Sequence, residues 1–480
     1  MEKDVFADTR MHPNLALMEG LTQRPVCCMV MKNAADAQVC ALDVQFVHVY
    51  RQGTLCTVLF ELPQESGWQA ALELRLGALG LTVGMSGPFA LAASAHGCMR
   101  KAQLALETGA RVAPQRALYP MNEYSEAALV AAAADVLAGE GFVQEDFCNA
   151  AIARMIELDA YAGTQYAGSL HAYLSHGLDL RRAAQALNIH RNTLDYRMKR
   201  VQELFELDLT DVNTCFELLF SFWLMDNFPG EAGRKQEKMQ DEKPFDPAWM
   251  QAALWRYMEG GAVQADDREA QFACRLLGVG VNRMADEDRA ALLRTLCALL
   301  PQAGTCAFDE DMLLFALPPQ EMEAFASACR VKCDKVGCHT VVTQALRAGR
   351  LMQRAKLCRM ALYAAPQCHV GMQEMGSMLF FMVLERRISL SPYLCEEVIR
   401  VMDDDAMRGT ALSRSLYAYL LNFMDMKRAA AQLGIHRNTM EYQMRKIDAL
   451  IGKTVSQSQR FLMMCTYKML ALPDMRHPEL

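Results

Sequence analysis

The strongest constraint on this chain is that it repeats itself. When 246 is added to each residue number, positions 179–201 align with positions 425–447, and 12 of these 23 positions are identical. Seven more differ by a conservative exchange, and the match extends upstream, where Ser169-Leu170 recurs as Ser415-Leu416. A segment this short cannot bury a core by itself, so its recurrence predicts one structural unit used twice.

A linker separates the two copies. Pro229–Pro247 combines Pro, Gly and mixed charge, with a charged run at Glu231–Lys243, and it lacks apolar periodicity. We therefore expect two related halves, residues 1–228 and 248–480. A chain of 480 residues is long enough for more than one hydrophobic core, which agrees with this division.

Each half opens with short apolar runs that predict an α+β module placed before the repeated segment. In the first half we expect strands at Val26–Met31, Val44–Tyr50, Leu55–Glu61 and Leu81–Met85, and helices at Trp68–Leu76 and His96–Glu107. In the second half we expect strands at Cys274–Val281, Thr305–Phe308, Met312–Leu317 and Thr340–Thr343, and helices at Asp286–Leu300, Glu321–Val331 and Met352–Tyr363. The predicted fold class is therefore α+β, as a tandem repeat of this module followed by an all-helical unit.

The repeated segment itself predicts two short helices joined by a tight turn. Asp179 is a good N-cap for the first helix, and Ala183 and Ala184 are small enough to let a second helix cross closely. The turn falls at Asn188, which becomes Gly434 in the second copy. Asn and Gly tolerate left-handed backbone best, and a tight helix-to-helix turn requires it.

The second helix of each pair has the two faces that a DNA-recognition helix needs. Leu194, Met198, Val201 and Phe205 form an apolar stripe at helical spacing. Residues 179–206 hold six basic and four acidic residues, and residues 425–453 hold six and three, so both segments are basic in a protein of net charge −7. Basic residues at the start of such a helix contact phosphates and guanine edges. We predict DNA contacts for His190, Arg191, Asn192, Thr193, Tyr196, Arg197, Lys199, Arg200, His436, Arg437, Asn438, Thr439, Tyr442, Arg445 and Lys446.

Composition limits where such a protein works. The acidic, mixed N-terminus MEKDVFADTR does not resemble a signal peptide, and the longest apolar stretch, Ala127–Ala138, is too short to span a bilayer. The 17 cysteines are then expected to be reduced thiols. These features favour a cytoplasmic protein, and the net charge of −7 argues against one that coats nucleic acid over its whole surface.

At the repeated residues the sequence resembles a known family. Leu187–Arg197, with its His-Arg-Asn-Thr core and Tyr196, resembles the C-terminal helix-turn-helix of PucR/CdaR-type bacterial transcriptional regulators, which is similar to the Fis-type DNA-binding fold. Ile435–Tyr442 resembles it equally. Val83–Pro88 followed by Met99–Ala102 resembles the degenerate GGDEF-like domain that precedes this unit in the family, and Met352–Leu357 matches Met99–Leu104.

The resemblance implies six segments, which we name by residue number. They are a degenerate GGDEF-like α+β module (1–120), a helical connector (121–162), a first helix-turn-helix domain (163–228), a linker (229–247), a second GGDEF-like module (248–390) and a second helix-turn-helix domain (391–474). The duplication is unusual for the family.

Two positions depart from the family pattern. Asp195 and Glu441 stand where the family usually has a basic residue; an acid there repels phosphate, although it can accept a hydrogen bond from cytosine N4. In addition, Gln443 replaces the arginine seen at Arg197, so we do not expect the two copies to be equivalent.

Other chemistry has weaker support. Nucleotide cyclases with a GGDEF domain use a Gly-Gly-acid-acid-aromatic hairpin, whereas the candidate hairpins here are Arg51–Thr54, without acids, and Phe308–Asp311, without a glycine pair. Cys329, Cys333, Cys338 and His339 have metal-ligand composition but lack the paired spacing of a structural zinc site, so buried cysteines are the simpler interpretation. We expect no enzyme activity, no cofactor and no metal.

The sequence therefore predicts a sequence-specific DNA-binding transcriptional regulator with two helix-turn-helix units. Double-stranded DNA is the expected partner, with room for a small-molecule effector, and the chain is expected to act as a homodimer or as an intramolecular pseudo-dimer. The alternative is a scaffold protein whose helix-turn-helix units have lost DNA binding.

Overall fold

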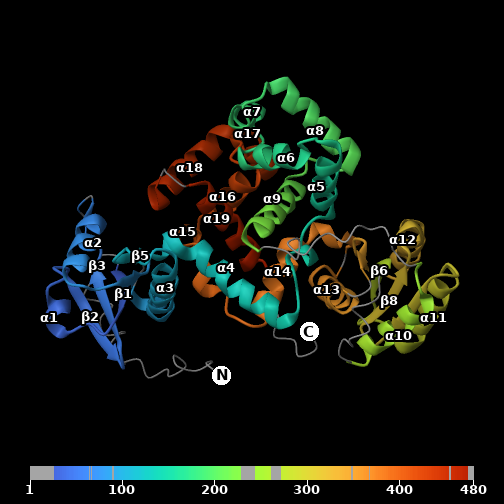
Figure 1. Ribbon diagram of the computed structural model, residues 1–480, viewed down its shortest axis with the longest axis horizontal. Helices are drawn as coiled ribbons and strands as arrows, with labels where there is room; N and C mark the ends of the chain where they lie inside the picture. The colour runs from blue at the N-terminus through green and yellow to red at the C-terminus, as the bar shows by residue number, and fades with distance from the viewer. Residues whose placement is uncertain are drawn as a thin grey trace. The chain divides into compact units, whose positions relative to one another are not determined.

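The computed structural model describes residues 26–63, 65, 67–88, 91–228, 244–260, 272–347, 350–366, 368–452 and 456–473 (Figure 1). The chain divides into two compact units. Unit 1 comprises residues 1–133, 389–416 and 442–467, and unit 2 comprises residues 134–388, 417–441 and 468–480. Each unit therefore combines segments from both halves of the sequence.

Unit 1 is built around a five-stranded sheet of order β2-β3-β1-β4-β5. β1 is antiparallel to β3 and β4, β2 and β3 form a hairpin that turns at Gly53 (φ +57°), and β4 and β5 are parallel. The strands are β1 (Val26–Lys32), β2 (Phe46–Gln52), β3 (Leu55–Glu61), β4 (Val83–Met85) and β5 (Leu118–Pro120).

Helices cover both faces of this sheet, because alternate side chains of β1 point to opposite sides. Val26, Cys28 and Val30 pack against α3 (Leu91–Val112) and the start of α4 (Met121–Glu140). Cys27, Met29 and Met31 pack on the other side against α1 (Asp36–Cys40) and α2 (Trp68–Ala78). Unit 1 also contains η8 (Ser391–Tyr393), α15 (Glu396–Arg408) and parts of α16 (Leu412–Leu421), α18 (Arg437–Ile451) and α19 (Gln457–Leu470).

The second sheet, in unit 2, has the same connectivity as the first. Its order is β7-β8-β6-β9-β11, with β6 antiparallel to β8 and β9, β7 antiparallel to β8, and β9 parallel to β11. A short extra strand, β10 (Leu346–Arg347), pairs with β6. The main strands are β6 (Ala273–Gly280), β7 (Thr305–Phe308), β8 (Met312–Leu317), β9 (Thr340–Val342) and β11 (Val370–Gly371).

Helices also cover this second sheet. One face packs against α11 (Asp286–Cys297) and α12 (Pro319–Asp334), and α13 (Leu351–Ala364) lies close to β6 at Gly278. α10 (Pro247–Met258) is tied to β7 because the Gln251 amide donates to the Cys306 carbonyl. η7 (Met372–Glu374) and α14 (Gly376–Glu385) follow.

Five further helices of unit 2 enclose a separate core. They are α5 (Ala150–Ala162), α6 (Tyr166–Ser175), α7 (Leu180–Ala186), α8 (Arg191–Phe205) and α9 (Val212–Asn227). Unit 2 also contains η2 (Gln144–Asp146) and α17 (Met426–Leu433). The core includes Leu170, Leu174, Leu194, Met198 and Val201, each at most 4% exposed. The apolar stripe predicted for residues 194–205 is thus the buried face of α8.

Most elements predicted from the sequence are present, with shifted ends. The strand expected from Val44 begins at Phe46, and the helix expected to reach Leu300 ends at Cys297. The linker was assigned too far toward the C-terminus, because Asp246 caps α10 and Pro247 is its first residue. Residues 229–243 of that linker and the N-terminal segment MEKDVFADTR lie outside the described residues. Within the described ranges, no helix is both long and apolar enough to cross a bilayer.

Candidate nucleic-acid interface

The predicted pair of helices is α7 and α8 in the first copy. The Asp179 carboxylate caps α7, because one of its oxygens accepts from the backbone N–H of Arg181 (2.8 Å) and of Arg182 (3.2 Å). These bonds hold the pKa of Asp179 below its usual range. In the second copy the Asp425 carboxylate caps α17 through the equivalent N–H groups of Lys427 and Arg428.

The turn after the first helix is left-handed in both copies. Asn188 has φ +53° and Gly434 has φ +65°. The chain then returns toward the first helix, since the backbone N–H of Ile189 donates to the Ala184 carbonyl at 3.0 Å and that of Ile435 donates to Ala430 at 3.0 Å. The prediction that Asn and Gly share this position because of its backbone conformation is confirmed.

The second helix of each copy starts with the same histidine cap. The Nδ1 atom of His190 accepts from the Asn192 backbone N–H at 3.2 Å, and Nδ1 of His436 accepts from Asn438 at 3.2 Å. A ring nitrogen that accepts carries no proton, so Nε2 is the nitrogen left to donate outward. The His-Arg-Asn-Thr side chains are exposed in both copies.

The acidic residue of each recognition helix pairs with a different cation. In α8 the Asp195 carboxylate contacts Lys199 (2.9 Å), one turn further on. In α18 the longer Glu441 carboxylate contacts Arg437 (2.9 Å), one turn earlier. No ion pair to Arg191 occurs among the described residues, so the first-turn arginine is unpaired in the first copy and paired in the second. Exposed pairs of this kind contribute only about 0–1 kcal/mol and exchange readily for a phosphate.

Arg197 lies on a different side of its helix from the residues above. Its guanidinium donates to the Ser169 hydroxyl (2.9 Å) and to the Gln165 side-chain oxygen (3.2 Å), both of which belong to the region of α6. In the second copy the Ser415 hydroxyl donates to the Gln443 side chain at 2.9 Å. The Arg-to-Gln difference therefore preserves one bond to an equivalent serine.

The other predicted contact residues lie on the outer side of the second helices. Tyr196 and Tyr442 are 61% and 55% exposed, and the Lys446 ammonium lies 4.7 Å from the centre of the Tyr442 ring. Arg200 pairs with Glu203 at 2.7 Å. Lys199 and Arg445 are exposed. Tyrosine and lysine side chains that are exposed next to each other can contact the sugar-phosphate backbone of DNA.

The two copies contact each other at equivalent turns within unit 2 (Figure 1). Gly177 (φ +73°) precedes α7, and its counterpart at +246 is Phe423. A Cβ atom at Gly177 would lie 3.1 Å from the Phe423 carbonyl oxygen. The Phe423 side chain is only 7% exposed and belongs to the core formed by α5–α9. Contact between equivalent positions is the mark of a self-complementary interface.

This contact was not predicted from the sequence, although a signal was present. Gly177-Leu178 and Phe423-Met424 occupy a turn where polar residues are usual. Leu178, Phe423 and Met424 all have positive φ values, between +52° and +67°, which apolar residues rarely adopt. An apolar turn with a strained backbone indicates that packing against another segment holds it in place.

The acidic hairpin of the second sheet is occupied by an arginine. The Arg359 guanidinium pairs with Asp309 and lies 3.6 Å from Asp311. Asp309 also accepts from the backbone N–H of Asp311 and of Met312, each at 2.9 Å, so it stabilises the turn. Cys329 and Cys333 lie on the buried face of α12, where burial raises the pKa of each thiol to about 12.

The repeated unit matches a known family model. Residues 166–224 and 412–464 match the family model described as the PucR C-terminal helix-turn-helix domain. The chain is 32% identical over 80 residues to the proline-responsive transcriptional activator PutR of Bacillus subtilis (strain 168), covering 17% of this chain and 20% of that protein. It is 30% identical over 70 residues to the DNA-binding transcriptional activator AdeR of the same organism, covering 15% and 17%. The chain thus spans about a fifth of the length of these curated relatives.

One solved structure also resembles part of the chain. It is described as the crystal structure of the regulator of polyketide synthase expression from Bifidobacterium adolescentis, and it shares 13% identity with a TM-score of 0.19. The similarity covers 42% of this chain and 80% of that one. At this score the likeness carries no structural argument.

Proposed function

We propose that this chain is a sequence-specific DNA-binding transcriptional regulator that binds DNA through two heads, because both repeated units match the family model of the PucR C-terminal helix-turn-helix domain. Head 1 is α6–α9 and head 2 is α16–α19. The observation that carries the proposal is that an exposed His-Arg-Asn-Thr turn opens the second helix of each head, while the opposite stripe of each helix is buried. Basic side chains at that position reach base edges and phosphates when the helix enters the major groove.

The contact between the heads supports an intramolecular pseudo-dimer. A single recognition helix contacts too few base pairs for useful affinity, and helix-turn-helix proteins usually add a second one by dimerising. Here the Gly177 turn and the Phe423 segment join the two heads within one chain. We therefore expect two related half-sites that are imperfectly matched, because Arg437 pairs with Glu441 while Arg191 has no equivalent pair among the described residues.

The α+β modules are proposed to serve regulation and assembly, not catalysis. The first hairpin has no acids, and the acids of the second are held by Arg359. We assign residues 1–120 and 248–390 as degenerate GGDEF-like modules that bind an effector or a second copy of the chain. The cytoplasm is the proposed location, because that is where a regulator meets bacterial DNA.

Substitution of the two first-turn arginines tests the DNA-binding proposal. The double variant Arg191→Ala/Arg437→Ala should bind a selected genomic fragment more weakly by roughly 2–6 kcal/mol, because each arginine loses a base or phosphate contact. The measurement is a gel shift across a salt series, in which the slope should also fall. The matched control Arg414→Ala changes a surface arginine outside both recognition helices. A folded double variant with unchanged affinity would instead favour the scaffold alternative.

A further inference from the structure

The α+β module of the first half is bound by a segment of the second half, inside unit 1. The Lys101 ammonium on α3 donates to the Leu394 carbonyl (3.2 Å) and lies 3.6 Å from the Glu396 carboxylate. The Gly87 backbone N–H, just after β4, donates to the same carboxylate at 2.9 Å. Both side chains of the Lys101–Glu396 pair are largely buried, at 12% and 15% exposed. A Cβ at Gly87 would overlap the Glu396 carboxylate, so a larger residue here would displace that side chain.

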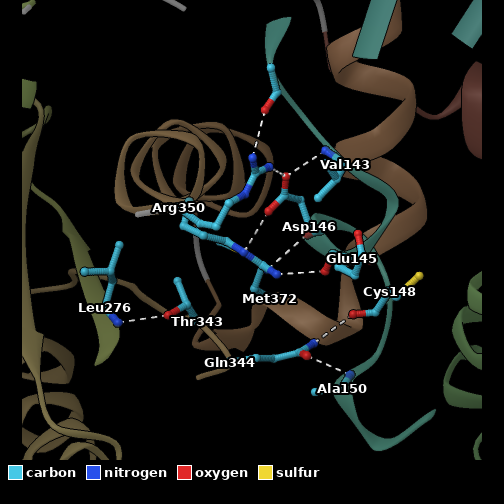
Figure 2. A network of polar contacts seen from close by, with 12 residues as sticks. Val143, Glu145, Asp146, Cys148, Ala150, Leu276, Thr343, Gln344, Arg350 and Met372 are labelled. Carbon is cyan, nitrogen blue, oxygen red and sulfur yellow. Dashed lines mark hydrogen bonds and ion pairs between the residues drawn. The ribbon is translucent and has the colours of Figure 1, made fainter. Parts of the chain in front are cut away.

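The α+β module of the second half is bound in turn by a segment of the first half, inside unit 2 (Figure 2). The Gln344 side chain, just after β9, accepts from the Ala150 N–H (2.6 Å) and donates to the Cys148 carbonyl (3.3 Å). On α13, Arg354 donates to the Asp146 and Glu145 carbonyls at 3.0 and 2.7 Å.

Buried charge strengthens this second contact. The Asp146 side chain is 2% exposed and pairs with both Arg350 and Arg354, and the Arg354 side chain is 7% exposed. Figure 2 shows the Arg350 side chain directed at this carboxylate. Removing one partner of such a pair leaves an uncompensated buried charge, so the arrangement fixes its position tightly.

These two contacts use equivalent positions. Adding 246 to Cys148 and Ala150 gives Leu394 and Glu396, which are the residues bound in unit 1. Alignment of β4 with β9 pairs Gly87 with Gln344. The residue before each of them has a hydroxyl that accepts a backbone hydrogen bond from the neighbouring strand. Ser86 accepts from the Cys28 N–H, and Thr343 accepts from the Leu276 N–H. The alignment of Met99–Leu104 with Met352–Leu357 pairs Lys101 with Arg354.

We propose that the two halves are cross-coupled: each α+β module docks on the segment that leads into the helix-turn-helix of the opposite half. The segment at 145–150 continues into α5 and head 1, yet the second module holds it. The segment at 394–396 continues into α15 and head 2, yet the first module holds it. An effector that reshapes one module would therefore act on the other half's head.

Zero-length carbodiimide cross-linking of the full chain tests the crossed contacts directly. Among the described residues, two lysine–carboxylate pairs join an α+β module to the opposite half, Lys101–Glu396 at 3.6 Å and Lys356–Glu140 at 4.0 Å. Mass spectrometry should find both cross-linked peptide pairs. When ¹⁴N- and ¹⁵N-labelled protein are mixed before cross-linking, both peptides of each pair should carry the same isotope, because the links form within one chain. Links from Lys101 to Glu140 or Glu145, or isotopically mixed pairs, would overturn coupling within one chain.

Hydrogen exchange of two variants, one at the aligned position of each module, tests whether the contacts control the opposite head. This readout does not depend on DNA binding. Gln344→Ala removes two bonds to the first half, and exchange in 150–175 should become roughly threefold faster or more. Gly87→Ala displaces Glu396, and the faster exchange should instead appear in 396–421. Variants whose exchange changes only in their own half, or nowhere outside the substituted module, would contradict the proposal.

Discussion

At the scale of single residues, the two recognition helices differ in which cation their acidic residue holds. Aspartate at 195 reaches forward to Lys199, and glutamate at 441 reaches back to Arg437. In the proposed DNA complex Arg437 therefore has to give up an ion pair, whereas Arg191 does not. Because exposed pairs contribute little, we expect this difference to tune the preference for one half-site over the other and not to abolish binding at either.

Arg197 provides a residue-scale prediction with a natural control. Arg197→Gln should leave both thermal stability and DNA affinity near wild type, because Gln443 already fills this position in the second copy and bonds to Ser415. Arg197→Ala should lower stability by about 1 kcal/mol, because the Ser169 hydroxyl and the Gln165 side-chain oxygen each lose a donor. Thermal unfolding and gel shifts measure the two effects. An affinity loss in Arg197→Gln as large as that of Arg191→Ala would place Arg197 at the DNA after all.

The residue roles were only partly predictable from sequence. The exposed first turn follows from helical periodicity, since Leu194 and Met198 fix which face is buried. The partners of Arg197 and Arg359 could not be predicted, because each is contacted by residues that lie tens of positions away, such as Ser169 and Asp309. A surface arginine that meets a carboxylate or hydroxyl after folding has the same local pattern as one that meets DNA.

At the scale of elements, caps and turns define the helix-turn-helix. Asp179 and Asp425 cap the first helices, and histidines cap the second ones. The sequence predicts the cap at Asp179, and the repeat places Asp425 at the equivalent position. Short pairings such as β5 and β11 were not predicted, because strands of two or three residues have too few side chains to show alternation.

The left-handed turn gives an element-scale prediction. Asn188→Ala should lower the free energy of unfolding by about 1 kcal/mol, because alanine tolerates φ +53° less well than asparagine. Asn188→Gly should be tolerated, since Gly434 occupies the equivalent turn at φ +65°. Urea unfolding of the two variants checks the difference. Equal stability of both variants would show that backbone conformation does not select the residue here.

At the scale of the whole molecule, one buried acid joins the two halves within unit 2. Glu217 on α9 accepts from the Ser377 N–H (2.8 Å) and hydroxyl (2.5 Å) on α14, and it lies 3.8 Å from Lys468 of α19. Burial raises the pKa of Glu217, and it outweighs the opposing effects of Lys468 and Ser377. The folded protein therefore keeps this proton at pH values where the unfolded chain has released it.

This shift predicts a pH dependence of stability. A folded-state pKa above the unfolded one contributes stability at low pH, and that contribution is lost as pH rises from the ordinary pKa of glutamate to the raised one. Glu217→Gln removes the titration. The difference in Tm, Glu217→Gln minus wild type, should therefore become more positive between pH 5 and pH 8. The prediction concerns this change with pH and not the size of the difference at any one pH. A difference that is flat or falls with pH would show that Glu217 is ionised in the folded protein.

The central claim, that one chain binds DNA with two heads, is tested most directly by hydroxyl-radical footprinting of a selected genomic fragment. Wild type should protect two related half-sites, spaced near a multiple of one helical turn if both heads reach one face of the DNA. Arg191→Ala should lose protection of one half-site, and Arg437→Ala should lose protection of the other. A single short footprint that Arg191→Ala weakens and Arg437→Ala leaves unchanged would contradict the account, because it would make head 2 a structural copy.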